Sequence, residues 1–126
     1  MRNDSLNDEK SVMVVDDDTS VRESMSRLLE AKGYSVLQAD NGQTALDLLK
    51  KESHFPCLVI LDLAMPIMDG RRFLEIRAED PILRDIPVVV VSGNPPPPKQ
   101  PKGIEAYLTK PVSVDRLIDV IKHKCD

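Results

Sequence analysis

Five short apolar segments recur along the chain, and each is followed directly by polar, proline or glycine residues. Two of them, Leu58–Leu61 and Val88–Val91, contain no polar residue at all. Continuous apolar runs of this length are typical of strands that are buried on both faces of a parallel sheet. We therefore predict five strands: Ser11–Val15, Tyr34–Ala39, Leu58–Asp62, Ile86–Ser92 and Ile104–Thr109.

Apolar residues at helical spacing follow the first, second, third and fifth of these strands. The predicted helices begin near Asp18 or Thr19, at Gln43, after Gly70 and near Ser113, and the first three end by Gly33, Glu52 and Asp80. Their inward residues are Val21, Met25, Leu28 and Leu29; Ala45, Leu48 and Leu49; Phe73, Leu74 and Ile76; and Val114, Leu117, Ile118 and Ile121. Alternation of strands and helices favours one α/β domain, a doubly wound parallel sheet over residues 11–126 behind a mobile tail of residues 1–10.

The segment from Gly93 to Gly103 breaks this alternation, because it holds five prolines, at 95–98 and 101. Proline lacks the amide proton and clashes with the preceding helical turn. Four consecutive prolines favour an extended polyproline II conformation. We therefore predict that a helix is missing here or reduced to a turn, and we read the prolines as a stiff connection or a ligand for a partner groove.

Composition narrows the class of protein. The chain of 126 residues has a formal net charge of −4, so no basic surface indicates direct nucleic-acid binding. The sequence contains neither an apolar run long enough for a membrane span nor a signal-peptide core. Cys57 and Cys125 lack metal-ligand spacing, and we expect both to be reduced thiols in a cytoplasmic protein.

Polar residues follow four of the predicted strands: Asp16 and Asp17, Asp62, Ser92, and Lys110. Carboxyl ends of parallel strands lie at one edge of the sheet, so these groups are expected to converge. Three carboxylates favour a hard cation such as Mg²⁺, and Lys with Ser can bind phosphoryl oxygens. Taken singly, each residue fits a simple turn or helix cap, but their joint position predicts a phosphoryl-transfer site with Asp62 as nucleophile.

Together these residues resemble a bacterial response-regulator receiver domain over about residues 11–124. The motifs that carry the resemblance are Val14–Asp18; Asp62 with Met65-Pro66 and Met68–Gly70; Pro87–Gly93; and Tyr107–Pro111. The resemblance implies a flavodoxin-like, five-stranded sheet of order 2-1-3-4-5. It also implies a chemotaxis-regulator-like, apparently single-domain protein, which is not a stand-alone turnover enzyme although it catalyses its own phosphorylation and dephosphorylation.

The resemblance assigns a role to each site residue. Asp62 would accept a phosphoryl group from a sensor histidine kinase or a histidine phosphotransfer protein, and signal to an unknown downstream protein. The metal ligands for Mg²⁺ would be Asp16 (through water), Asp17, Asp62 and the main-chain carbonyl of Ala64. Lys110 and Ser92 would contact phosphoryl oxygens.

The family's conformational switch maps onto Ser92 and Tyr107, which would move together on phosphorylation. The resemblance further implies a cis peptide bond between Lys110 and Pro111. Two positions that tune phosphate lifetime in the family hold Ala64 and Asn94 here, which leaves that lifetime open. The prolines occupy the place of the family's fourth helix, so output through that face is in question.

Two other functions are compatible with parts of the sequence. A phosphorylation-independent, receiver-like interaction module is suggested by the proline segment, although every expected active-site residue type is present. A phosphatase of the haloacid dehalogenase type is suggested by Asp16 and Asp18 after a strand. That family's pattern wants Thr or Val where this chain has Ser20, and the chain is short for a phosphatase with a cap.

Overall fold

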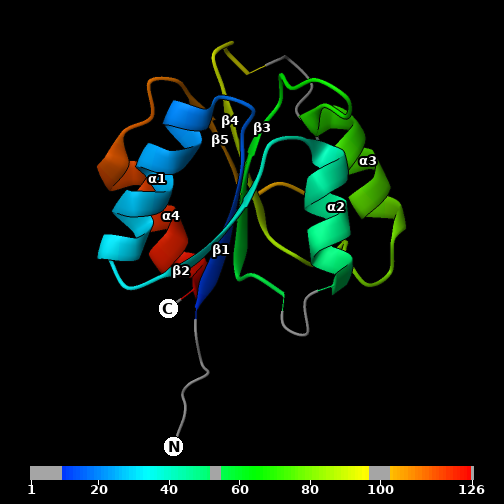
Figure 1. Cartoon of the computed structure of the whole chain (residues 1–126), viewed down its shortest axis with the longest axis horizontal. Coiled ribbons are helices and arrows are strands. Elements are labelled where there is room, and N and C mark those ends of the chain that lie inside the picture. Colours follow the sequence, from blue (N-terminus) through cyan, green and yellow to red (C-terminus); the bar gives the residue numbers. More distant parts are fainter. Residues whose placement is uncertain (1–9, 52–54, 97–102, 126) are drawn as a thin grey trace, which may run out of the picture.

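A computed structural model describes residues 10–51, 55–96 and 103–125 (Figure 1). Five strands form one parallel sheet of order β2-β1-β3-β4-β5, which confirms the predicted topology. The elements are β1 Ser11–Val15, α1 Thr19–Ala31, β2 Ser35–Ala39, α2 Gly42–Lys51, β3 Leu58–Asp62, α3 Gly70–Glu79, β4 Val88–Ser92, β5 Ala106–Thr109 and α4 Val114–Cys125. Most of the predicted tail, residues 1–9, lies outside the described residues.

Helices cover both faces of the sheet, α1 with α4 on one side and α2 with α3 on the other (Figure 1). Alternate residues of the central strands enter two separate cores. Met13, Val59 and Val90 pack on the side of α2 and α3, whereas Val12 and Val89 pack on the side of α1 and α4. Both faces need apolar side chains, which explains the uninterrupted apolar runs of β1, β3 and β4.

The helical stripes differ from prediction in three places. At the start of α4, Val114 is 47% exposed, although the sequence predicted that it faces inward. Leu46 is fully buried in α2, whereas Leu48 is only half-buried against the core. On α1, Val21, Met25 and Leu28 are half-buried, because the space between α1 and α4 remains an open groove. The sequence period identified these helices correctly, but the width of the gap beside α1 set how deeply its stripe is buried.

The connection from β4 to β5 contains no helix among its described residues, 93–96 and 103–105. Pro95 and Pro96 are exposed and irregular, while residues 97–102, which include the other prolines, lie outside the described part. Four helices occur among the described residues, and none of them lies between β4 and β5, which agrees with the prediction.

Arg77 of α3 forms hydrogen bonds with the segments that lead into β4 and β5. Its guanidinium donates to the carbonyl oxygen of Ile86 from Nε (2.9 Å) and Nη2 (2.7 Å), and from Nη2 to that of Gly103 (3.3 Å). The side chain is almost fully buried, and this burial lowers the pKa of Arg77 from its usual value. An interior guanidinium is tolerated here because backbone carbonyls accept its protons.

The expectation of two reduced thiols was wrong, since a disulfide joins Cys57 to Cys125. Cys57 immediately precedes β3 and Cys125 ends α4, and their Cα atoms are 5.3 Å apart. The cysteines are 68 positions apart in sequence, so a reading of sequence spacing could not show that the fold brings them together. Within the described residues, no helix is both long and apolar enough to cross a membrane.

Candidate functional site

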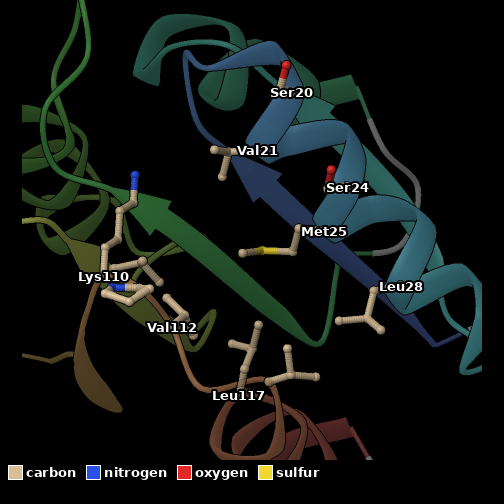
Figure 2. Close-up of a pocket in the computed structure, with 11 residues that line it drawn as sticks. Ser20, Val21, Ser24, Met25, Leu28, Lys110, Val112 and Leu117 are labelled. Carbon is tan, nitrogen blue, oxygen red and sulfur yellow. The ribbon is translucent and has the colours of Figure 1, made fainter.

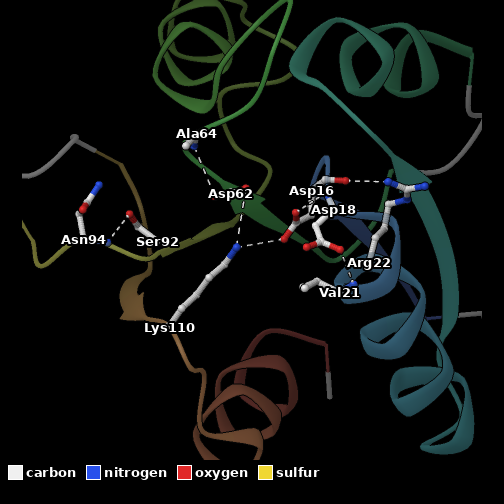
Figure 3. Close-up of polar contacts among 9 residues, drawn as sticks. All are labelled: Asp16, Asp18, Val21, Arg22, Asp62, Ala64, Ser92, Asn94 and Lys110. Carbon is white, nitrogen blue, oxygen red and sulfur yellow. Dashed lines mark hydrogen bonds and ion pairs between the residues drawn. The ribbon is translucent and has the colours of Figure 1, made fainter.

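The structure brings the predicted polar residues to one edge of the sheet (Figure 3). Asp16 follows β1, Asp62 ends β3, Ser92 ends β4 and Lys110 follows β5. Asp16 and Ser92 are held by the flanking strands, because the Asp16 amide donates to Ala39 O (3.1 Å) and the Lys110 amide to Ser92 O (2.7 Å). The peptide bond between Lys110 and Pro111 is cis, as predicted.

Three carboxylates form a compact cluster. Ligand oxygens of Asp16, Asp17 and Asp62 lie within 4.8 Å of one another. Asp16 and Asp62 are 5% and 6% exposed, whereas Asp17 faces solvent. An all-oxygen set with one open side suits a hard cation such as Mg²⁺, which keeps several of its waters. The residues present therefore fit the predicted metal site.

Lys110 contributes a cation that contacts two carboxylates of this cluster. Its Nζ lies 3.3 Å from Asp16 Oδ2 and 3.8 Å from Asp62 Oδ2 (Figure 3). Burial raises the pKa of Asp62, and the charge of Asp16 raises it further. Lys110 and the amide of Ala64, which donates to Asp62 Oδ1 at 3.3 Å, lower it only in part. The site therefore holds more negative charge than its own lysine balances, a condition that favours cation binding.

Asp18 has a different task from its two neighbours. Its side chain caps α1 by accepting the Val21 amide at 3.1 Å, while its own amide donates to Asp16 Oδ1 at 2.9 Å. The helix-cap interpretation therefore holds for Asp18. Asp16 also takes part in the turn, but its carboxylate is buried beside Asp62 and is not solvated. A phosphatase that used the Asp16–Asp18 pair as its two acids would need Asp18 free of this structural role.

Comparison with known proteins identifies the family. The sequence matches the response regulator receiver domain over residues 12–122. The chain belongs to this family. It is 36% identical over 117 residues to the polar-differentiation response regulator DivK of Brucella anthropi, covering 90% of this chain and 94% of DivK.

Solved structures agree with this assignment. The chemotaxis response regulator CheY4 of Vibrio cholerae superposes with a TM-score of 0.80 at 26% identity, covering 91% of this chain and 98% of CheY4. The receiver domain of the hybrid histidine kinase CckA gives a TM-score of 0.76 at 30% identity, covering 92% and 99%. The chain is thus a receiver domain of two-component signalling, a system in which the partner class is the histidine kinase.

In this receiver domain, Asn94 links the two predicted switch residues. The main-chain N–H of Asn94 donates to Ser92 Oγ at 3.2 Å, and the Tyr107 hydroxyl donates to the main-chain carbonyl oxygen of Asn94 at 3.2 Å. Ser92 is buried and Tyr107 is half-buried. The sequence marked Asn94 by its distance from Ser92, but no sequence signal indicated that its backbone would contact both side chains.

Arg22 also contributes to the site, although sequence reasoning missed it. From α1 its Nη1 donates to the Asp16 carbonyl oxygen at 2.8 Å (Figure 3). Its Nε donates to Gln38 Oε1 of β2 at 3.1 Å. The guanidinium thereby ties the acidic turn to a neighbouring strand. Its position one residue after Val21, at the edge of an apolar stripe, resembled that of an ordinary solvated arginine.

The loop from β3 to α3 packs closely around Asp62. The Gly70 amide donates to Leu63 O at 2.9 Å, and a Cβ at Gly70 would lie 2.5 Å from the Asp62 carbonyl oxygen. Glycine is therefore required there. Ile67, in the same loop, has a φ of 66° and is 85% exposed, a left-handed conformation that is unfavourable for a β-branched residue.

An apolar groove of about 430 Å³ begins at Lys110 and runs between α1 and α4 (Figure 2). Met25 and Leu28 of α1 face Leu117 of α4 across it, and Val112 lies near its end at Lys110. The groove explains why the inward stripe of α1 is only half-buried, and it adjoins the acidic site through the side chain of Lys110.

Proposed function

We propose that this receiver domain is a phosphoacceptor in a two-component phosphorelay, with Asp62 as the residue that is phosphorylated. The observation that carries the proposal is the burial of Asp62 at the end of β3 beside Asp16, with the Lys110 ammonium within 4 Å of both carboxylates. An Asp62 oxygen would attack the phosphorus of a phosphohistidine, and the P–N bond would break as the acyl phosphate forms. The histidine leaves with its electron pair and takes up a proton.

Asp16, Asp17, Asp62 and the main-chain carbonyl of Ala64 are the proposed ligands for Mg²⁺, with Asp16 acting through water. When bound, the ion would neutralise negative charge on the transferring phosphoryl group. Lys110 would pair with one phosphoryl oxygen, a role supported by the distance of less than 4 Å between its Nζ and Asp62 Oδ2. The Ser92 hydroxyl would donate to another oxygen.

Ser92, Asn94 and Tyr107 provide a route from the phosphate to the surface. If the Ser92 hydroxyl turns toward a phosphoryl oxygen, it breaks the hydrogen bond that Ser92 Oγ accepts from the main-chain N–H of Asn94 in this structure. The Asn94 backbone can then move, and its carbonyl holds the Tyr107 hydroxyl. We infer that phosphorylation biases the position of Tyr107 through these two hydrogen bonds, without the family's fourth helix.

The proposed partners are a sensor histidine kinase or a histidine phosphotransfer protein upstream and an unidentified protein downstream. Signalling by protein contact in the cytoplasm, without direct binding to nucleic acid or membrane, is part of the same proposal. The residues around β5 and the proline segment differ from the family's usual output face, so we expect a downstream partner with different contacts there.

The test is phosphorylation by acetyl phosphate or phosphoramidate with Mg²⁺. We expect an acid-stable, alkali-labile adduct on the wild-type chain and none on Asp62→Asn. Asp18→Asn is a matched control, because asparagine caps a helix as well as aspartate does. If no adduct forms with either donor or with any kinase, Asp62 is not a phosphoacceptor.

The alternative is a receiver-like module that signals without phosphate. Its motivation is the proline segment at the usual output position. Titration with Mg²⁺ separates the two functions, since a working carboxylate site should bind the ion in the millimolar range and a module without the site should not.

A further inference from the structure

We propose that Cys57 and Cys125 form a redox-active pair: a reversible disulfide, opened by dithiol reductants, that fastens the end of α4 to the start of β3. The bridge is intramolecular, with Cα atoms 5.3 Å apart, and it lies at the opposite end of the strands from Asp62. This modification site does not rest on the proposed phosphoacceptor function.

Neither cysteine is sealed inside the core. Cys57 and Cys125 are each half-buried at the margin of the core beneath α4. Cys125 is also the last residue of α4, and the last turn of a helix frays more readily than its interior. Disulfides that are accessible in this way exchange more readily than fully buried ones.

The structure also accommodates the reduced state. Cys57 Sγ lies 3.2 Å from the carbonyl oxygen of Ser11, so the reduced thiol would have a hydrogen-bond acceptor in place. The end of α4 keeps two further attachments, the buried side chain of Ile121 and the ion pair between Lys124 Nζ and Glu105 Oε1 at 2.8 Å. Opening the bridge therefore loosens α4 without unfolding the domain, as a reversible switch requires.

The exchange chemistry balances with a dithiol as the co-reactant. One thiolate of the dithiol attacks a cystine sulfur, the S–S bond breaks, and a mixed disulfide forms. The second thiol of the reductant resolves it. Two electrons and two protons pass from the dithiol to Cys57 and Cys125, leaving two protein thiols and a disulfide in the reductant. Glutathione disulfide reverses the reaction by accepting the two electrons.

The consequence falls on α4 and on the groove that it forms with α1. Leu117 of α4 lies across that groove from Met25 and Leu28 (Figure 2), and Val114 of α4 also lines the groove. A firmly docked α4 holds this wall in place, whereas a loosened one lets it fluctuate. Lys110 precedes α4 and is held by β5 pairing, so the acidic site itself should change little.

The experiment compares the oxidised and reduced full chain. Thiol titration of denatured protein should find no reactive thiol after glutathione disulfide treatment and two after dithiothreitol. Reduction should lower Tm by about 10 °C, given the long loop that the bridge closes. Amide exchange in the last two turns of α4 should become at least tenfold faster, while β1 and β3 keep their protection.

Cys125→Ser is the matched variant. Under oxidising conditions it should have the Tm and the α4 exchange of reduced wild type, and dithiothreitol should change neither. Cys57→Ser should behave alike, which guards against a folding defect of one variant. The proposal is overturned if glutathione disulfide leaves two free thiols, if it links chains into dimers instead, or if oxidised and reduced protein share the same Tm and exchange.

Discussion

The two ends of the parallel strands in this receiver domain use buried charge in opposite ways. At the carboxyl ends, Asp16 and Asp62 are buried side by side, and burial and mutual repulsion raise the pKa of Asp62. At the amino ends, the equally buried Arg77 gives its donors to the carbonyl oxygens of Ile86 and Gly103. The carboxyl ends therefore leave negative charge uncompensated, whereas at the amino ends hydrogen bonds satisfy the donors of the guanidinium.

This difference separates reactivity from stability. A carboxylate that accepts a cation and a phosphoryl group must retain unsatisfied charge, and that charge destabilises the fold until a ligand arrives. The amino end has no such task in the proposed function, and it carries the Arg77 hydrogen bonds, the Lys124–Glu105 ion pair and the disulfide. We expect mutations at the two ends to change stability in opposite directions.

The largest effect is expected at Arg77. Arg77→Met keeps much of the apolar length but removes both hydrogen bonds to Ile86, leaving a buried carbonyl oxygen without its partner. Stability should fall by about 3 kcal/mol, measured by urea unfolding. Arg84→Met, at an exposed arginine in the following turn, is the control and should change it by less than about 0.5 kcal/mol. Equal effects in the two variants would mean that the Arg77 contacts contribute nothing beyond charge.

Asp62→Asn should have the opposite sign. Because the pKa of Asp62 is raised, the folded state keeps its proton to a higher pH than the unfolded chain does. The stability linked to this carboxyl is full below the unfolded pKa of about 4 and is lost as pH rises through the folded value. Asp62→Asn should therefore stabilise the fold at pH 7 in EDTA, by on the order of 1 kcal/mol.

The gain from Asp62→Asn should shrink as pH falls toward about 4, where the wild-type carboxyl becomes neutral. Asp18→Asn is the control, because Asp18 lies next to Asp16 and Asp17 in the sequence. The stability of this variant should stay within about 0.5 kcal/mol of wild type, since aspartate and asparagine can both cap α1 at this position. A wild type that is more stable than Asp62→Asn at pH 7 without metal would contradict the charge imbalance proposed for this edge.

Ile67 tests whether the carboxyl edge also stores backbone strain. Its φ of 66° suits glycine, and its side chain is 85% exposed, so little packing is lost on truncation. Ile67→Gly should raise stability by about 0.7 kcal/mol in thermal unfolding. Ile82→Gly is the matched control, because Ile82 is also exposed but has no positive φ. That variant should be destabilised, and a shared direction of change would remove the argument from strain.

Sequence reasoning succeeded where one-dimensional pattern and topology determine the answer. Apolar runs identified the strands. The rule that the carboxyl ends of parallel strands lie at one edge of the sheet predicted that Asp16, Asp62, Ser92 and Lys110 lie close together. Proline chemistry predicted that the described residues between β4 and β5 contain no helix, because a residue without an amide proton interrupts helical hydrogen bonding.

The missed features depend on distances that no local pattern encodes. Cys57 and Cys125 meet only because α4 crosses the sheet to the start of β3. No pattern in the sequence indicated the contacts of Arg77, since its partners are backbone carbonyls of residues outside its own helix. The Asn94 link likewise uses backbone groups, which are the same in every residue type and leave no trace in the sequence.

The smallest expected effect concerns Arg22, which connects the acidic turn to β2. Arg22→Lys keeps the positive charge but cannot reach both the Asp16 carbonyl and Gln38 Oε1, which the guanidinium contacts from Nη1 and Nε. The turn that carries Asp16 and Asp17 should become less ordered, and affinity for Mg²⁺ should fall about threefold, or about 0.6 kcal/mol, in calorimetric titration.

Charge and position can be separated with a second variant at Arg22. Unlike Arg22→Lys, Arg22→Met removes the positive charge beside the acidic cluster as well as the hydrogen bonds. Loss of that charge by itself strengthens cation binding, so the affinity for Mg²⁺ should fall less in Arg22→Met than in Arg22→Lys. Gln38→Ala, which removes the strand end of the link, should reproduce part of the lysine effect. If Arg22→Lys binds Mg²⁺ as wild type does while Arg22→Met binds it more tightly, Arg22 acts through its charge alone, and the acidic turn is ordered without it.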